Sequence, residues 1–148
     1  MPHKFKLHLT GLIVCLCFCA STWAAETVGY VENLQGDVTA RQPDGSLRTL
    51  AVGADVYLKD HFETGPTAFV KIKFADDTRT SMGEKSQLVI DDFQFREQKT
   101  SFALNVIKGF FRVVTGKIGK LRPKAVTVRT GVVATIGIRG TDFGGEVA

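Results

Sequence analysis

Residues 68–74 carry the strictest pattern in this sequence, and that pattern limits the fold more than any other feature. Apolar side chains occupy every second position from Ala68 to Phe74, and Lys71 and Lys73 stand between them. Successive side chains of an extended strand point to opposite faces, so this alternation predicts a strand with one buried and one solvated face. Such a strand needs partners for its backbone and a cover for its apolar face, which only a sheet in a larger core supplies.

Shorter runs of the same type recur along the chain. Residues 88–90, 102–106 and 126–130 alternate in the same way, and glycine-containing turns separate the runs at short intervals. Many short strands punctuated in this way are typical of an all-β domain. The recurrence is too irregular for a strict repeat array. Two arrangements stay open, a wound β-solenoid and a sandwich-like domain, with a jelly-roll-like sandwich as the second choice.

Two local details refine this picture. Asp76-Asp77 predicts a turn after the first strand, because aspartate side chains bond to nearby backbone N–H groups, and residues 78–81 can return as the next strand. Residues 102–108 are the best helix candidate, but the Val-Val-Thr run at 113–115 favours a strand through this region.

The first 24 residues have the layout of a secretory signal peptide. Lys4 and Lys6 precede an apolar run from Leu12 to Ala20, and Thr22 and Ala24 supply small residues for a cleavage site. The run is shorter than the ~20 residues that a membrane-spanning helix needs, although an uncleaved anchor is the alternative. We therefore expect one periplasmic or secreted domain at 25–148. All three cysteines lie in residues 12–20, so a processed chain would contain no disulfide.

The charge is distributed unevenly. The chain has a formal net charge of +4, but residues 25–97 hold 13 acidic and 8 basic side chains, and residues 98–148 hold 9 basic and 2 acidic ones. The densest basic segment, expected to be a loop at 117–124, could contact an anionic partner such as an envelope polymer or a membrane surface. A solvated face that maintains solubility is the alternative. No nucleic acid is expected as partner of an exported protein. The candidate contact residues are Lys117, Lys120, Arg122 and Lys124.

Catalytic and metal-binding patterns are weak in this sequence. After residue 24 the sequence has one histidine, His61, and the neighbouring Asp60 would point to the opposite face of a strand, which is a poor start for a catalytic triad. Zinc sites draw on cysteine and histidine, and a calcium loop needs more oxygen ligands than Asp91-Asp92 offers. We therefore predict a non-enzymatic protein without a metal or cofactor. Hydrolysis by paired carboxylates remains a third, unspecific hypothesis.

The C-terminal stretch places an arginine and an aspartate directly after an apolar run. We expect residues 132–138 to form a core strand, and Arg139 to pair with a carboxylate or to cap backbone carbonyls at its end. In this interpretation Arg139 and Asp142 are structural. The alternative is that Arg139 contacts an anionic ligand or partner.

Several segments together resemble the FecR-type periplasmic domain, the family named for the regulator of ferric dicitrate transport. The resemblance extends from about residue 28 to 143, and its most specific element is the run that ends in IGIRGTDF. The weaker elements are GDV at 36–38, LAVGADV at 50–56, DHFETGPTA at 60–68 and EKSQL at 84–88. The motif residues singled out by this resemblance are Gly36, Gly53, Thr64, Gly65, Arg139, Gly140, Thr141, Asp142 and Phe143.

The resemblance implies a periplasmic all-β module that binds a protein partner, with a role in envelope signalling or sigma-factor-linked regulation. Two departures qualify it. Gly131 stands where the family commonly has proline, and the family usually continues beyond the R-G-T-x-F element with further strands, so we expect a C-terminally truncated domain. Only Met1 to Lys6 precede the apolar region when Leu7 and Leu9 are counted with it, so we expect no sigma-binding segment there. The family therefore implies the fold and the compartment more directly than the signalling role.

Overall fold

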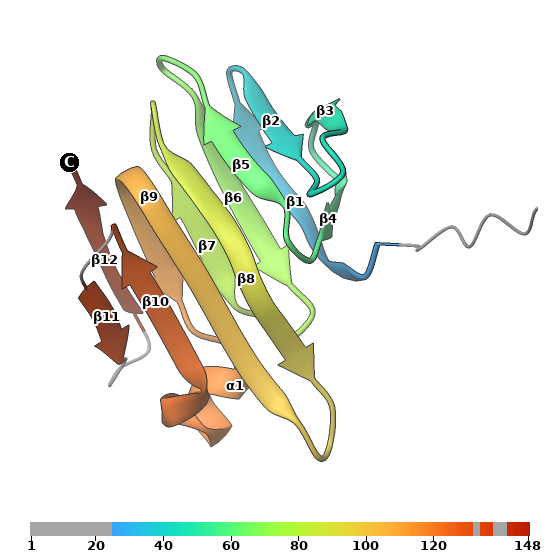
Figure 1. Cartoon of the computed structure of the whole chain (residues 1–148), viewed down its shortest axis with the longest axis vertical. Helices are drawn as coiled ribbons and strands as arrows, with labels where there is room; N and C mark the ends of the chain where they lie inside the picture. The colour runs from blue at the N-terminus through green and yellow to red at the C-terminus, as the bar shows by residue number, and fades with distance from the viewer. Residues whose placement is uncertain (1–24, 132–133, 138–141) are drawn as a thin grey trace, which may run out of the picture.

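The computed structural model describes residues 25–131, 134–137 and 142–148, with residues 134–137 described by their backbone. The elements are almost all strands (Figure 1). The bounds are β1 Thr27–Gln35, β2 Val38–Arg41, β3 Leu47–Thr49, β4 Asp55–Tyr57, β5 His61–Thr64, β6 Phe69–Phe74, β7 Arg79–Met82, β8 Gln87–Phe95, β9 Thr100–Val114, β10 Val126–Thr130, β11 Ala134–Gly137 and β12 Asp142–Val147, with a short helix α1 at Lys117–Leu121 and a 3₁₀ turn η1 at Pro123–Ala125.

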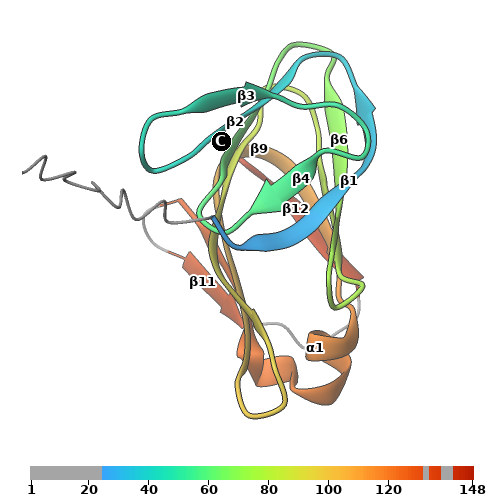
Figure 2. The ribbon, with the colours of Figure 1, turned by 90° about the vertical axis from the view of Figure 1, so that its right-hand side faces the viewer.

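The strands form one curled sheet that doubles over into two layers (Figure 2). The front layer contains β3, β2, β5, β8, the first half of β9, β10 and β11 in that spatial order. The back layer contains β4, β1, β6, β7, the second half of β9 and β12. The prediction of an all-β domain is therefore confirmed.

Strand β9 belongs to both layers. Residues 102–106 pair with β10 in the front layer, and residues 109–114 pair with β12 in the back layer. The change of layer occurs at Gly109, which has a φ of 90°. A Cβ atom at this position would lie 2.1 Å from the Oγ atom of Ser86, so only glycine lets the two backbones approach so closely.

The core lies between the two layers, and it forms because the alternating apolar positions of each layer face inward. Val70, Ile72 and Phe74 of β6 are buried on the back layer, as the alternation at 68–74 predicts. The rings of Phe74 and Phe102 meet edge to face across the layers with centroids 4.9 Å apart. Phe93 of the front layer completes the cluster at 5.5 Å from Phe74.

The pattern of strand pairing decides between the two arrangements that the sequence leaves open, a β-solenoid and a sandwich-like domain. Among the described strands, β9 and β10 form the one parallel pair, and every other pair is antiparallel. A wound solenoid stacks its coils with parallel neighbours, whereas hairpin-connected layers give antiparallel ones. The domain is therefore sandwich-like.

The segment at 117–124 is helical, and the expectation of a loop is wrong. Ile118 is the fully buried residue of α1. The backbone N–H of Lys117 donates to the Asp76 carbonyl at 2.7 Å, and that of Ile118 donates to the Asp76 carboxylate at 3.2 Å. Pro123 then starts η1. A helix of five residues is too short for its periodicity to be visible in a sequence, and it depends on contacts from a distant turn.

The predicted turn at 76–77 is that distant turn. The Asp76 carboxylate accepts bonds from the backbone N–H and the hydroxyl of Thr78, at 3.1 and 2.7 Å. In the described part of the chain, neither helical segment has the length and apolar character that crossing a bilayer requires.

Candidate functional site

The carboxylate of Asp60 is a structural centre and does not serve a catalytic histidine. Its side chain is fully buried and accepts bonds from the Nε2 of Gln42, from the guanidinium of Arg48 at 2.5 Å and from the backbone N–H of Tyr57 at 2.9 Å. His61 is the first residue of β5 and is partly exposed, so its side chain lies on the face opposite to the buried Asp60, as the alternation of side chains along a strand predicts. The two side chains therefore do not form the start of a triad.

Of four predicted motif residues, Thr64 ends β5 and the three glycines lie between strands, and Gly36, Thr64 and Gly65 are close together. Thr64 donates its hydroxyl to the carbonyl of Gly83 at 2.6 Å and accepts the Ser86 N–H at 2.8 Å. The N–H of Gly65 donates to the carbonyl of Asp37 at 2.9 Å. Gly36 has a φ of 73°, and a Cβ atom there would lie 2.9 Å from the Cα of Ala68, whereas Gly53 lies apart in the turn before β4. These positions support an interpretation of the motif as fold-determining.

The C-terminal motif is described in part. Arg139, Gly140 and Thr141 lie outside the described residues, so the pairing expected for Arg139 stays a prediction. Asp142 forms an exposed ion pair with Arg112 at 2.5 Å, and hydrogen bonding to Arg112 lowers the pKa of the Asp142 carboxyl below its ordinary value. The ring of Phe143 meets Phe111 edge to face at 6.4 Å.

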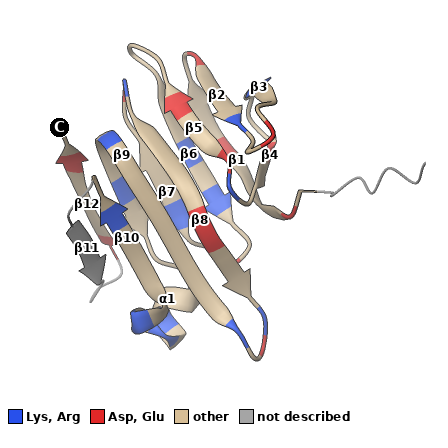
Figure 3. Cartoon of the chain, viewed as in Figure 1, with Lys and Arg blue, Asp and Glu red and all other residues tan. Residues whose placement is uncertain are grey.

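The four basic residues predicted from the sequence, Lys117, Lys120, Arg122 and Lys124, lie at one end of the molecule together with Arg96 and Lys99, and we call these six residues the basic end. They come from the tip of the β8–β9 hairpin and from α1 and η1, which lie side by side at the lower end of Figure 3. Lys117 pairs with Asp77 at 3.2 Å, and hydrogen bonding to Lys117 lowers the pKa of that aspartate. Lys120, Arg122 and Lys124 are exposed and form no ion pair with a described residue.

Two apolar side chains stand among these cations. Leu121 is 75% exposed and Phe95 is 39% exposed. Both line a hollow of about 320 Å³ between the hairpin tip and α1, together with Arg96, Arg122 and Glu97. Sequence analysis missed this pairing because the two residues are 26 positions apart and only the crossover from β9 to β10 brings them together.

A second feature lies at the other end of the front layer, where β3 forms the edge. Leu50 donates its N–H to Val38, and Gln42 donates to Ser46, each at 2.9 Å. In an antiparallel ladder, hydrogen-bonded and non-hydrogen-bonded residue pairs alternate. Leu47 and Thr49 belong to non-hydrogen-bonded pairs with β2, so their N–H and C=O groups point away from that strand. Among the described strands β3 pairs with β2 alone, so the N–H and C=O groups of Leu47 and Thr49 meet no other strand there.

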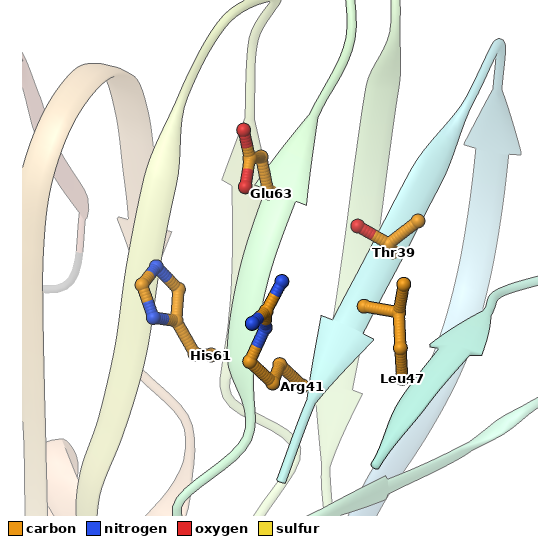
Figure 4. Close-up of a pocket in the computed structure, with 5 residues that line it drawn as sticks. All are labelled: Thr39, Arg41, Leu47, His61 and Glu63. Atoms are coloured by element: carbon orange, nitrogen blue, oxygen red, sulfur yellow. The ribbon is translucent and has the colours of Figure 1, made fainter. Parts of the chain in front are cut away.

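Next to this edge is a hollow of about 190 Å³ lined by Thr39, Arg41, Leu47, His61 and Glu63 (Figure 4). Leu47 is 59% exposed, and the guanidinium of Arg41 lies over β5 between His61 and Glu63. No ion pair between Arg41 and Glu63 occurs within the described part of the chain. The Nε2 atom of His61 is buried and has no hydrogen-bond partner among the described residues. The hollow therefore offers a donor, an acceptor and an apolar wall to a visiting side chain.

Side chains that could bind a metal do not cluster in the described part of the chain. Within the residues that the structure describes, no three histidine, cysteine, aspartate or glutamate side chains come together as a metal site would require. The two sites that the geometry builds are therefore surfaces, the β3 edge with its hollow and the basic end.

Parts of the chain are similar to known proteins. A solved structure described as a cell surface anchoring domain is 29% identical over a match covering 42% of this chain and 82% of that one, with a TM-score of 0.41. No curated protein matches the chain. A family model described as FecR protein matches residues 60–148, which is more than half of the chain and includes the segments from DHFETGPTA onward. The chain belongs to the FecR protein family.

Proposed function

We propose that this chain is a non-enzymatic module of the cell envelope, periplasmic or secreted, that binds a protein partner at the edge of β3. Family membership supports a regulatory or binding role over catalysis. The single observation that carries the proposal is the open backbone of Leu47 and Thr49 beside the hollow of Figure 4.

Strand addition explains how this edge would bind. An extended peptide can pair with free N–H and C=O groups at a sheet edge, and pockets beside the edge then select its side chains. Leu47 supplies apolar contact, while Arg41 and Glu63 supply opposite charges for the peptide's polar side chains. The edge is only three residues long, which is suited to a reversible contact.

Site-directed cross-linking in the native host tests this proposal. A benzophenone amino acid at Leu47 should give one discrete adduct with an envelope protein, and the same group at Val114, 37% exposed on the back layer, should give none. Thr49→Pro removes an N–H that points away from β2, so it should reduce the Leu47 adduct while the domain stays folded. An adduct that survives Thr49→Pro unchanged, or that forms equally at Val114, would contradict strand addition.

A second candidate function rests on the basic end. The exposed and unpaired cations there support contact with an anionic partner, either an envelope polymer or a membrane surface. Interactions between exposed charges are screened by salt. The protein should therefore bind a heparin-type polyanion column at low salt and elute before the salt reaches about 0.5 M. Retention above that concentration would count against this function.

The proposed compartment depends on removal of residues 1–24. Export and cleavage near Ala25 should yield a periplasmic or secreted species that lacks all three cysteines and Trp23. Intact mass and fractionation of the protein from its host measure this directly. A membrane-bound species that retains Met1 would instead support an anchored protein, and the partner would then be sought at the inner membrane.

A further inference from the structure

We propose that the basic end docks on an anionic lipid bilayer, with its cations at the headgroups and Leu121 and Phe95 reaching the boundary of the acyl chains. This inference rests on the second candidate function, an anionic partner at the basic end, and it names that partner's chemical class.

The apolar pair distinguishes a bilayer from a soluble anionic polymer. Leu121 projects from α1 and Phe95 from the β8–β9 hairpin, yet both border one hollow, flanked by Arg96 and Arg122. A polyanion satisfies the guanidinium groups but leaves Leu121 in water. A bilayer interface offers phosphates to the cations and hydrocarbon to the leucine within a few ångströms of each other.

The basic end carries more cations than carboxylates that pair with them. On the back layer, Arg79 pairs with Glu32 and Arg112 with Asp142. At the basic end Arg96 and Lys117 have one carboxylate each, with Glu26 at 3.6 Å and Asp77 at 3.2 Å. The other four cations there form no ion pair with a described residue, and Glu97 is the one acidic side chain lining the hollow. A net positive surface therefore faces outward.

The patch is held in place by the core. Ile118, three positions before the exposed Leu121 in α1, is fully buried, and the Asp76 carboxylate accepts a hydrogen bond from its N–H. Arg122 donates its N–H to the carbonyl of Ile118 at 2.8 Å, which closes the helix. Because α1 and the hairpin tip are already ordered and lie at the same end in both views, docking needs little rearrangement (Figures 1 and 2).

Vesicle co-sedimentation tests the inference, using the form of the protein that its host accumulates. Vesicles containing about 30% phosphatidylglycerol in phosphatidylcholine supply the anionic surface. Replacing Lys120, Arg122 and Lys124 together with glutamine should lower partitioning about 100-fold, since each cation near an anionic surface contributes about fivefold. Leu121→Ser should lower it about tenfold without changing the thermal midpoint, because the side chain is largely exposed.

Two matched variants away from the basic end serve as controls. Lys108→Gln removes an exposed cation, and Val52→Ser removes an aliphatic side chain that is 63% exposed, and both should bind vesicles like the parent protein. In a Trp23→Phe background, Leu121→Trp should show a blue-shifted emission on anionic vesicles, which reports entry into an apolar medium.

Each other outcome overturns the inference. Unchanged vesicle binding of Leu121→Ser, together with equal binding to soluble polyphosphate, would leave an anionic polymer as partner and the second candidate function intact. Absence of binding to either probe at low salt would overturn both. Equal binding to vesicles of pure phosphatidylcholine, or an equal loss of vesicle binding in the control variants, would show that the basic end is not the docking surface.

Discussion

At position 60 a carboxylate without exposed surface meets three donors, from the turn between β2 and β3, from β3 and from β4. Arg48 is the charged donor, and its own side chain is 29% exposed and stacked over Tyr57 at 4.6 Å. The Gln42 amide and the Tyr57 N–H donate to the same carboxylate, so Asp60 is the acceptor that all three donors share. Asp60, which the sequence already indicated to be poorly placed to assist His61, therefore connects β3 at the edge of the front layer to β4 of the back layer.

Asp60→Ala should lower the free energy of unfolding by about 3 kcal/mol, because removal of one partner strands a partly buried charge. Urea denaturation followed by circular dichroism measures the change. Asp55→Ala, an exposed carboxylate on β4, is the control and should change stability by less than about 0.5 kcal/mol. A loss for Asp60→Ala no larger than the control's would contradict the structural role.

At the scale of elements, β12 shows how an edge strand is attached. Its inward side chains Phe143 and Val147 pack on the core, and on the outer face Asp142 bonds to Arg112 of β9. The hydrogen bond to Arg112 is the main cause of the lowered pKa of Asp142, and Asp142 raises the pKa of Arg112 in turn. The attachment is therefore sensitive to acid.

The sign of this effect follows from the lowered pKa. The pair stabilises the folded chain fully above pH 3.8, the ordinary value, and the contribution is lost as pH falls through the lower pKa of the folded state. The urea midpoints of the parent and Asp142→Asn should therefore differ by a constant amount from neutral pH to about pH 5 and converge below the ordinary pKa. Because the pair is exposed, the difference should be small and should shrink with added salt. A difference that persists in strong acid would show that the ion pair is not its cause.

At the scale of the whole molecule, the two layers share one core and one strand. β9 pairs with β8 and β10 in front and with β7 and β12 behind, so neither layer can be removed without exposing the apolar face of the other. The rings of Phe74, Phe93 and Phe102 join the layers at one end. Cooperative unfolding of both layers is the expected consequence.

Phe102→Ala tests this coupling. The side chain is 1% exposed, so its truncation should cost about 3–5 kcal/mol. Hydrogen exchange should show β5 in front and β6 behind losing protection together, because the cavity weakens a core that both layers share. Phe110→Ala, which truncates a ring that is 49% exposed, should have a much smaller effect. Loss of protection confined to one layer would contradict a single cooperative unit.

Much of the architecture was readable from the sequence. The alternation at 68–74, the Asp76-Asp77 turn and the strand through 102–108 all follow from local rules, because side-chain direction in a strand depends only on position parity. The R-G-T-x-F run, together with weaker segments such as D-x-x-x-T-G in the right order, indicated the FecR family. The concentration of cations at 117–124 was also visible, because charge is counted without knowing the fold.

Tertiary structure decided the rest, because long-range pairing brings together residues that no local window compares. The five-residue helix α1 exists because Ile118 is buried and Asp76, 42 positions earlier, binds its backbone. Leu121 joins Phe95 only through the parallel crossover from β9 to β10, and the open edge at β3 follows from which strands end the front layer. Sequence determined what each strand would bury, and packing of the two layers decided which side chains remained at the surface to meet a partner.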